Sequence, residues 1–108
     1  MSAPFVTQLR ARRGLLQLAP AGTPALTVRV EVPEVWDTVA AVVAPAESVR
    51  ALKAAALNTI YPDGTDAGAW VMKLRGFEVL DEAQSLSSVG AEDGSIFLLT
   101  HRRRRPVR

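Results

Sequence analysis

The chain has 108 residues, 48% of them apolar, which leaves room for one domain with one modest core. It contains no cysteine and a single histidine, which excludes disulfides, thiolate chemistry, cysteine-bound zinc and a metal site built from histidines. The formal net charge is +2. No apolar run approaches a membrane span, and residues 1–18 have arginines where a secretory signal would need its apolar region, so we expect a cytoplasmic protein. No cofactor or bound metal is expected.

Residues 1–24 form a basic arm with alanine, proline and three arginines, Arg10, Arg12 and Arg13. This composition favours a mostly disordered arm. A second interpretation rests on the leucines among residues 15–18, which could add an edge strand to a sheet or cover exposed sheet. We predict one folded domain over residues 25–101, preceded by this arm and followed by a tail of residues 102–108.

Two strands that pair as a hairpin are predicted next. In Leu26–Val32, valines alternate with Arg29 and Glu31, the pattern of a half-buried strand. After a short interruption, Asp37–Val43 is a second run rich in β-branched residues. Trp36 lies beside the turn, where we expect it to shield the end of the core.

A junction between strand and helix occupies residues 43–53. Pro45 suits the first turn of a helix and Ser48 is a good N-cap in a slightly later register, so the first helical residue stays open. Lys53 falls within the apolar stripe of this helix, so we expect its methylenes to pack on the core and its ammonium to reach a carbonyl group or water. A catalytic role for this lysine is not expected. The apolar stripe consists of Val49, Leu52, Ala56, Leu57 and Ile60.

After the helix, Pro62, Asp63 and Gly64 form a turn signal. Residues 70–75 alternate and predict a strand that ends at Gly76, followed by a short strand over residues 77–80 and a loop over residues 81–91. In the first of these strands the expected inward residues are Trp70, Met72 and Leu74, and the outward ones are Val71, Lys73 and Arg75.

The last predicted strand, residues 95–101, is apolar on both faces. We therefore expect it to be central in the sheet, with one face on the helix and the other partly covered or kept for a partner. The order strand, strand, helix, strand, short strand, strand, with one helix to cover one sheet face, predicts an α+β roll.

At the junction between strand and helix over residues 43–53, the chain resembles the ubiquitin-like β-grasp family. In that family the strand ends in valine and is followed by proline, an acidic residue, serine or threonine, an aliphatic residue and an aliphatic–lysine pair. The matching residues are Val43, Pro45, Glu47, Ser48, Val49, Leu52 and Lys53. The family's next glycine, its two leucines and its closing strand are matched by Gly76, Leu80, Leu86 and residues 96–100, with one extra residue before Leu80. The resemblance implies a β-grasp roll in ββαββ order, with a mixed sheet packed on one helix.

The run L-S-S-V-G-A-E-D-G-S from Leu86 to Ser95 is particularly similar to bacterial ubiquitin-like proteins of the YukD type, some of which are associated with type VII secretion. Ubiquitin and the sulfur carriers end in Gly-Gly, whereas this sequence ends Arg105-Pro106-Val107-Arg108, so conjugation by the usual route is not expected. Ubiquitin also has an aliphatic residue where this chain has Lys73, and we expect a different partner surface.

That surface is expected on the open face of the sheet. The family register directs Phe97 and Leu99 to the helix and the residues beside them outward, although a one-residue slip would exchange the pairs. Residues 15–18 are the alternative cover for this face. The expected partner-binding residues are Ile96, Leu98, Val71, Lys73 and Arg29.

The tail carries a basic run that consists of Arg102, Arg103, Arg104, Arg105 and Arg108. Residues 14–101 contain all 11 acidic residues of the chain and only five of its 13 basic ones, so the body of the chain is acidic. We expect a solvated extension that keeps this acidic body soluble or docks an acidic partner, in preference to contacts with nucleic acid, because no aromatic residue is interleaved with the arginines. His101 lies beside this positive charge without a neighbouring carboxylate in sequence, so a general base is not expected there.

These observations predict a non-enzymatic, non-covalent protein-binding module or adaptor, accessory to a bacterial secretion or ubiquitin-like system. Two alternatives stay open. One is a ubiquitin-like modifier with an atypical or processed C-terminus, and the other is a nucleic-acid-binding protein with a basic tail.

Overall fold

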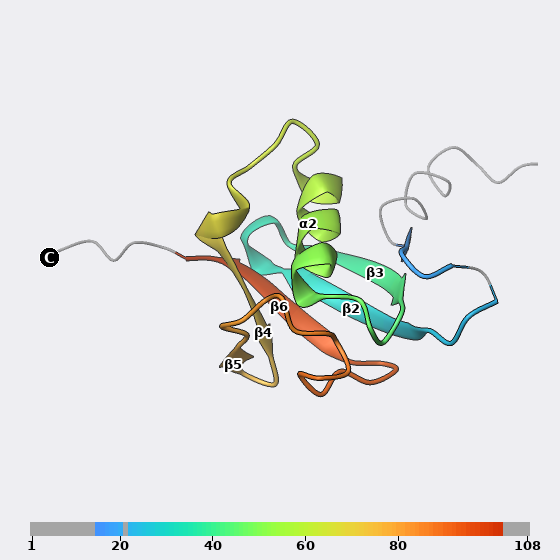
Figure 1. The fold of residues 1–108 in the computed structure, drawn as a ribbon. Helices are drawn as coiled ribbons and strands as arrows, with labels where there is room; N and C mark the ends of the chain where they lie inside the picture. The colour runs from blue at the N-terminus through green and yellow to red at the C-terminus, as the bar shows by residue number, and fades with distance from the viewer. Residues whose placement is uncertain (1–14, 21, 103–108) are drawn as a thin grey trace, which may run out of the picture.

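The computed structural model describes residues 15–20 and 22–102, and the predictions for residues 1–14 and for Arg103, Arg104, Arg105 and Arg108 lie outside this part of the chain. One helix lies across one face of a mixed six-stranded sheet, and no described element covers the other face, which we call the open face (Figure 1). The elements in chain order are β1 (Leu15–Gln17), β2 (Leu26–Val32), the 3-10 helix η1 (Pro33–Val35), β3 (Asp37–Val43), α2 (Val49–Ile60), the 3-10 helix η2 (Ala67–Ala69), β4 (Trp70–Leu74), β5 (Phe77–Glu78) and β6 (Ile96–His101).

The strand order across the sheet is β1-β3-β2-β6-β4-β5. Two neighbouring pairs are parallel, β1 with β3 and β2 with β6, and the other pairs are antiparallel. The prediction that the last strand is central is confirmed, because β6 lies between β2 and β4. The α+β roll with a mixed sheet on one helix is confirmed as well.

The hairpin of β2 and β3 has the predicted strands, but Trp36 does not shield the core as we expected. Its side chain is 93% exposed. Pro33 begins η1, the Trp36 N–H donates to the Pro33 carbonyl oxygen at 3.2 Å, and Trp36 then adopts left-handed backbone with φ 55°. This turn directs the indole out of the hairpin, which no alternating pattern in the sequence could indicate.

The helix α2 begins in the later of the two registers that the sequence left open. The Ser48 hydroxyl accepts from the Ala51 N–H at 3.0 Å, which satisfies one of the free donors in the first turn. The 82–86 segment also fastens this end of the helix, since Glu82, Gln84 and Leu86 contribute backbone bonds to residues 47–50. The buried face of α2 consists of Val49, Leu52, Lys53, Ala56 and Leu57.

Lys53 packs within this face as predicted, and only 4% of it is exposed. Its Nζ donates to the Trp70 carbonyl oxygen at 2.9 Å and lies 2.7 and 2.8 Å from the two carboxylate oxygens of Glu82. The expected carbonyl partner is confirmed. The sequence gave no indication of the carboxylate, which comes from the irregular segment between β5 and β6.

An amine-labelling reagent should therefore modify Lys73 faster than Lys53 in the folded protein. We expect a difference of about tenfold or more, because Lys53 must leave Glu82 and Trp70 by local opening before it reacts. Lys73, on the open face, is only partly buried. Mass spectrometry after brief labelling measures both rates in one sample. Equal rates would contradict the position of Lys53 on the buried face of α2.

Two details after β4 differ from expectation. The short strand covers only Phe77–Glu78. Val79 is in the core, whereas Leu80 is 85% exposed, so the core residue follows Gly76 by three positions and no extra residue intervenes. The error arose because both side chains are apolar and the sequence does not mark which one the turn directs inward. Leu86 is fully buried, as the resemblance implied.

Of the interpretations given for residues 15–18, the structure shows the edge strand, β1. Leu16 and Leu18 pack against the core, and β1 lies beyond β3, at the opposite edge of the sheet from β5. Because two strands separate β1 from β6, this segment does not cover Ile96 and Leu98.

Candidate protein-binding surface

The sheet register brings outward residues of the six strands into two rows on the open face. In the first row Leu15, Ala40, Arg29 and Ile96 are successive partners across β1, β3, β2 and β6. The second row runs across β3, β2, β6, β4 and β5 and consists of Thr38, Glu31, Leu98, Lys73 and Glu78. Neighbouring strands lie about 4.8 Å apart, so each row presents adjacent side chains to the same side.

Four of the five predicted partner-binding residues meet on this face. Ile96 is 48% exposed, Arg29 is exposed, and Leu98 and Lys73 are partly exposed. Phe97 and Leu99 are fully buried on the helix side, so the predicted register of β6 is confirmed. The alternation follows from the period of two along a strand.

Val71, the fifth predicted residue, is not available as we expected, because only 5% of it is exposed. It alternates with the buried Trp70 and Met72, and Arg102 and Glu78, one on each side of β4, form an ion pair of 2.8 Å. Arg102 extends the register of β6 beside Ala69, and Glu78 on β5 is paired with Lys73. A bridge between these two positions must cross β4 at Val71.

Arg102, predicted as the first residue of the basic tail, directly follows β6 and is tied to the sheet by a backbone hydrogen bond and by this ion pair. Its backbone N–H donates to the Ala69 carbonyl oxygen, which continues the ladder between β4 and β6 by one step. The ion pair itself is largely exposed and contributes little stability. The other four predicted tail arginines lie outside the described residues.

Sequence reasoning missed Leu15 as a member of this surface. It is half exposed and shares the first row with Ile96. The two adjacent leucines at residues 15 and 16 gave no alternation from which to assign a face. Only the pairing of β1 with β3 determines that Leu15 points to the open side.

His101 is placed by packing and backbone pairing. Its ring lies edge-on to the Trp70 ring, with centroids 5.1 Å apart, and its backbone N–H donates to Glu34 Oε2 at 2.8 Å. Among residues 15–20 and 22–102, no three His, Asp or Glu side chains are grouped as a metal site would require. None of the helices in the described part of the chain has the length and apolar character that a membrane crossing needs.

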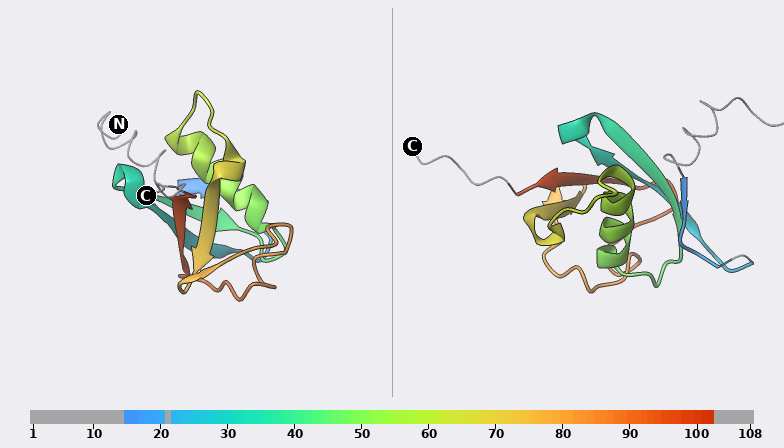
Figure 2. Two further views of the ribbon diagram at one scale, coloured as in Figure 1. Left: turned by 90° about the vertical axis from the view of Figure 1, so that its left-hand side faces the viewer. Right: turned by 90° about the horizontal axis from the view of Figure 1, so that it is seen from above.

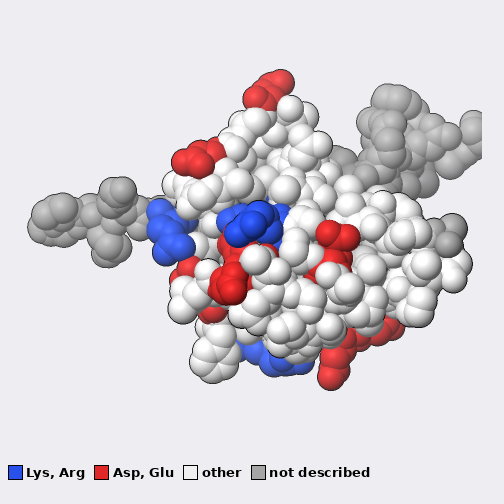
Figure 3. Space-filling view, viewed as in Figure 1, with Lys and Arg blue, Asp and Glu red and all other residues white. Residues whose placement is uncertain are grey.

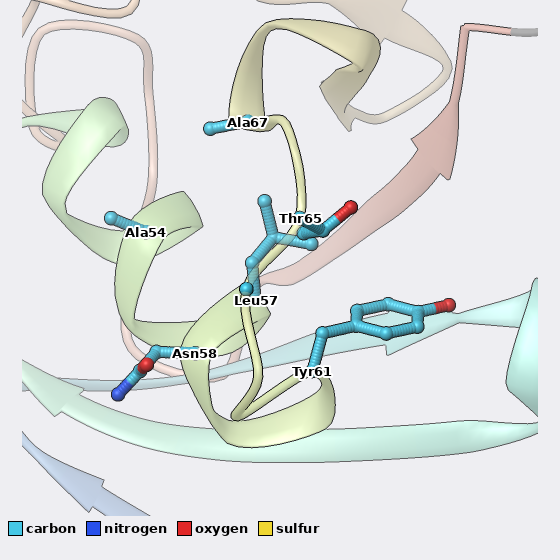
Figure 4. Close-up of a pocket in the computed structure, with 7 residues that line it drawn as sticks. Ala54, Leu57, Asn58, Tyr61, Thr65 and Ala67 are labelled. Atoms are coloured by element: carbon cyan, nitrogen blue, oxygen red, sulfur yellow. The ribbon is translucent and has the colours of Figure 1, made fainter.

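A small hollow of about 190 Å³ lies on the other side of the molecule, between the end of α2 and the loop that follows it. In Figure 4 the side chains of Asn58 and Tyr61 point to opposite sides of the helix end, so their polar groups do not converge. Among the described residues, lysine and arginine side chains also form no single patch on this helix side (Figure 3). The described residues of this side therefore form neither a cluster of reactive groups nor a strongly charged surface.

Comparison with solved structures identifies the fold. A ubiquitin from Caldiarchaeum subterraneum is 17% identical with a TM-score of 0.63, and the match covers 77% of this chain and 100% of that ubiquitin. The C-terminal ubiquitin-like domain of mouse tubulin-specific chaperone e is 12% identical with a TM-score of 0.65, covering 82% and 98%. A ubiquitin-like domain from an Arabidopsis thaliana protein is 19% identical with a TM-score of 0.61, covering 83% and 90%.

No protein-family model and no curated protein matches the sequence. At these identities the structural similarity concerns the fold alone. The chain has a ubiquitin-like β-grasp fold, to which β1 adds one strand at the edge beyond β3.

Proposed function

We propose that this ubiquitin-like β-grasp domain is a non-covalent protein-binding module whose partner docks on the open face of its sheet. The observation that carries the proposal is the exposure of Ile96 and Leu98 on a central strand, where a sheet of this fold has no second layer. Since both side chains are already partly covered, burying the remainder would stabilise a complex by about 2–3 kcal/mol.

The charges around these residues favour an amphipathic partner. Arg29 stands beside Ile96, and Leu98 lies between Glu31 and Lys73. Both signs are therefore present next to the apolar pair, which suits a protein surface with an apolar centre and a polar rim. A partner of uniform charge would meet an unfavourable neighbour on this face.

The more specific roles are proposals of the same kind. An adaptor in a bacterial secretion or ubiquitin-like system, and a cytoplasmic location, rest on the YukD-type resemblance and on the composition. Identification of the neighbouring genes would test them, because secretion ATPases and activating enzymes point to different systems. The modifier and the nucleic-acid binder are weaker proposals, since no contact among residues 15–20 and 22–102 favours either.

Capture of partners from the native cell tests the open face. The variant Ile96→Ser/Leu98→Ser should lose the partner that the wild-type chain captures. The matched control is Phe77→Ser/Leu80→Ser, which removes two exposed apolar side chains away from this face and should retain the partner. The free energy of unfolding should change by about 1 kcal/mol or less for the control.

Two results would overturn the proposal. One is full capture by the open-face variant. The other is equal loss of capture in both variants, which would indicate a general loss of apolar surface and not a specific site. A melting curve for each variant distinguishes lost binding from lost folding.

A further inference from the structure

The second row of the open face has an acid on one side of Leu98 and a base on the other. Glu31 on β2 and Lys73 on β4 are the register partners of Leu98 on its two neighbouring strands, so they lie about 10 Å apart across β6. Neither side chain has a hydrogen bond or ion pair within the part of the chain that the structure describes. Glu78, the neighbour of Lys73 on β5, is paired with Arg102 instead. Two unlike charges on this row therefore stand without a partner among the described residues.

The row is complementary to itself about Leu98. One step outward, Glu31 on one side corresponds to Lys73 on the other, and two steps outward, Thr38 corresponds to Glu78. A second copy can face the first about a two-fold axis that runs parallel to β6 between the two sheets. Glu31 of each copy then lies opposite Lys73 of the other copy, and Leu98 lies opposite Leu98. Thr38 lies opposite Glu78, so no like charges meet within the row.

The twist of the sheet is compatible with this arrangement. Figure 2 shows that the strands change direction between the β2–β3 hairpin and β6, as the right-handed twist of a sheet requires. A two-fold rotation preserves handedness, so both sheets twist in the same sense and opposed strands stay aligned. Ile96 lies about 7 Å from Leu98 along β6 and also meets its own counterpart. The apolar pairs then form the centre of the contact, and the charged pairs form its rim.

We infer that the open face binds a second copy of this chain through the second row. This inference rests on the proposed function and names the occupant of that same face. A different protein would have to supply a base, an apolar side chain and an acid in this order and at this spacing, whereas a second copy has them already. The contact involves a few residues of each copy, so we expect a weak dimer with a Kd of about 100 µM.

Sedimentation equilibrium of the purified full chain measures this association. Between about 10 µM and about 1 mM, the mean molar mass of the wild type should rise from that of a monomer toward that of a dimer. The variant Ile96→Ser/Leu98→Ser should stay monomeric over the same range. Added salt should weaken the wild-type dimer, because it screens the attraction between the charged rims.

Two single variants test the pairing of the charges. Glu31→Lys leaves the row with two bases beside Leu98, and Lys73→Glu leaves it with two acids, so each alone should dimerise about tenfold more weakly than the wild type. An equimolar mixture of the two should dimerise about as strongly as the wild type, because every base then faces an acid. The double variant Glu31→Lys/Lys73→Glu should also self-associate, since exchange of the two signs preserves the complementarity.

Recovery in the mixture is not explained by general attraction. The formal net charge of +2 rises by two units in Glu31→Lys and falls by two units in Lys73→Glu, so neither variant is net negative. The matched control is Asp63→Lys, which changes an exposed acid in the loop after α2 and should dimerise as the wild type does. A melting curve for each variant shows that it is folded.

Three results would overturn the inference: a wild type that stays monomeric at about 1 mM, a dimer that Ile96→Ser/Leu98→Ser retains, and a mixture that associates no more strongly than its two components. These results are distinct from failure of the proposed function. A monomeric chain that captures a different protein, and loses it in Ile96→Ser/Leu98→Ser, would contradict the inference and support the proposed function. Full capture of a different protein by this variant, together with loss of the purified dimer, would support self-association as the use of the open face.

Discussion

Replacement of Lys53 by methionine should destabilise the fold by about 3 kcal/mol, as is typical when one member of a buried ion pair is removed. Methionine preserves most of the apolar stem but removes the ammonium that bonds to Glu82 and to the Trp70 carbonyl. The Glu82 side chain is only 17% exposed, so water replaces the lost partner incompletely. Urea unfolding followed by far-ultraviolet circular dichroism measures the change.

The second lysine of the chain provides the matched control. Lys73→Met removes an equal charge from a partly exposed position on the open face, and we expect a change of about 0.5 kcal/mol or less. The double variant Lys53→Met/Glu82→Met should lose less stability than Lys53→Met alone, because no charge is then left without its partner. Equal effects of Lys53→Met and Lys73→Met would contradict the buried ion pair.

Local periodicity was sufficient to predict most of the fold. The bounds of β2 and β3 agree with the predicted runs, because alternation of valines with polar residues is a property of each strand by itself. The buried stripe of α2 and the inward side of β6 follow from the same kind of pattern. The sheet order required the additional knowledge that one helix covers one face.

The errors concern features that arise only when distant segments meet. Val71 has the correct direction but is buried, at a position of β4 that the sheet register places between Arg102 and Glu78. The partner of Lys53 lies 29 positions further along the chain, in a segment without periodicity. Trp36 was assigned to the core from its residue type, whereas the backbone of its turn decides its direction.

The same distinction applies to the candidate surface. Arg29, Lys73, Ile96 and Leu98 could be predicted to share a face because the register of each strand is encoded locally. Leu15 and Arg102 could not, since the first depends on the pairing of β1 with β3 and the second on the extension of the ladder between β4 and β6. Whether a partner uses this face is a question for the capture experiment.

A pair of substitutions at adjacent positions of β6 should have very different effects, and this difference tests the register on which the open face depends. Phe97→Ala should cost about 4 kcal/mol, because the ring is fully buried beneath α2 and its removal leaves a cavity. Ile96→Ala should cost about 1 kcal/mol, since the side chain is half exposed and loses only part of its burial. Both values come from urea unfolding, where an unchanged dependence on urea confirms that the same transition is compared. A one-residue slip of the strand would exchange the two faces and reverse the order of the two losses. The reversed order would place Ile96 and Leu98 in the core. The proposed binding surface would then have no apolar centre, even if the capture experiment showed a loss of the partner.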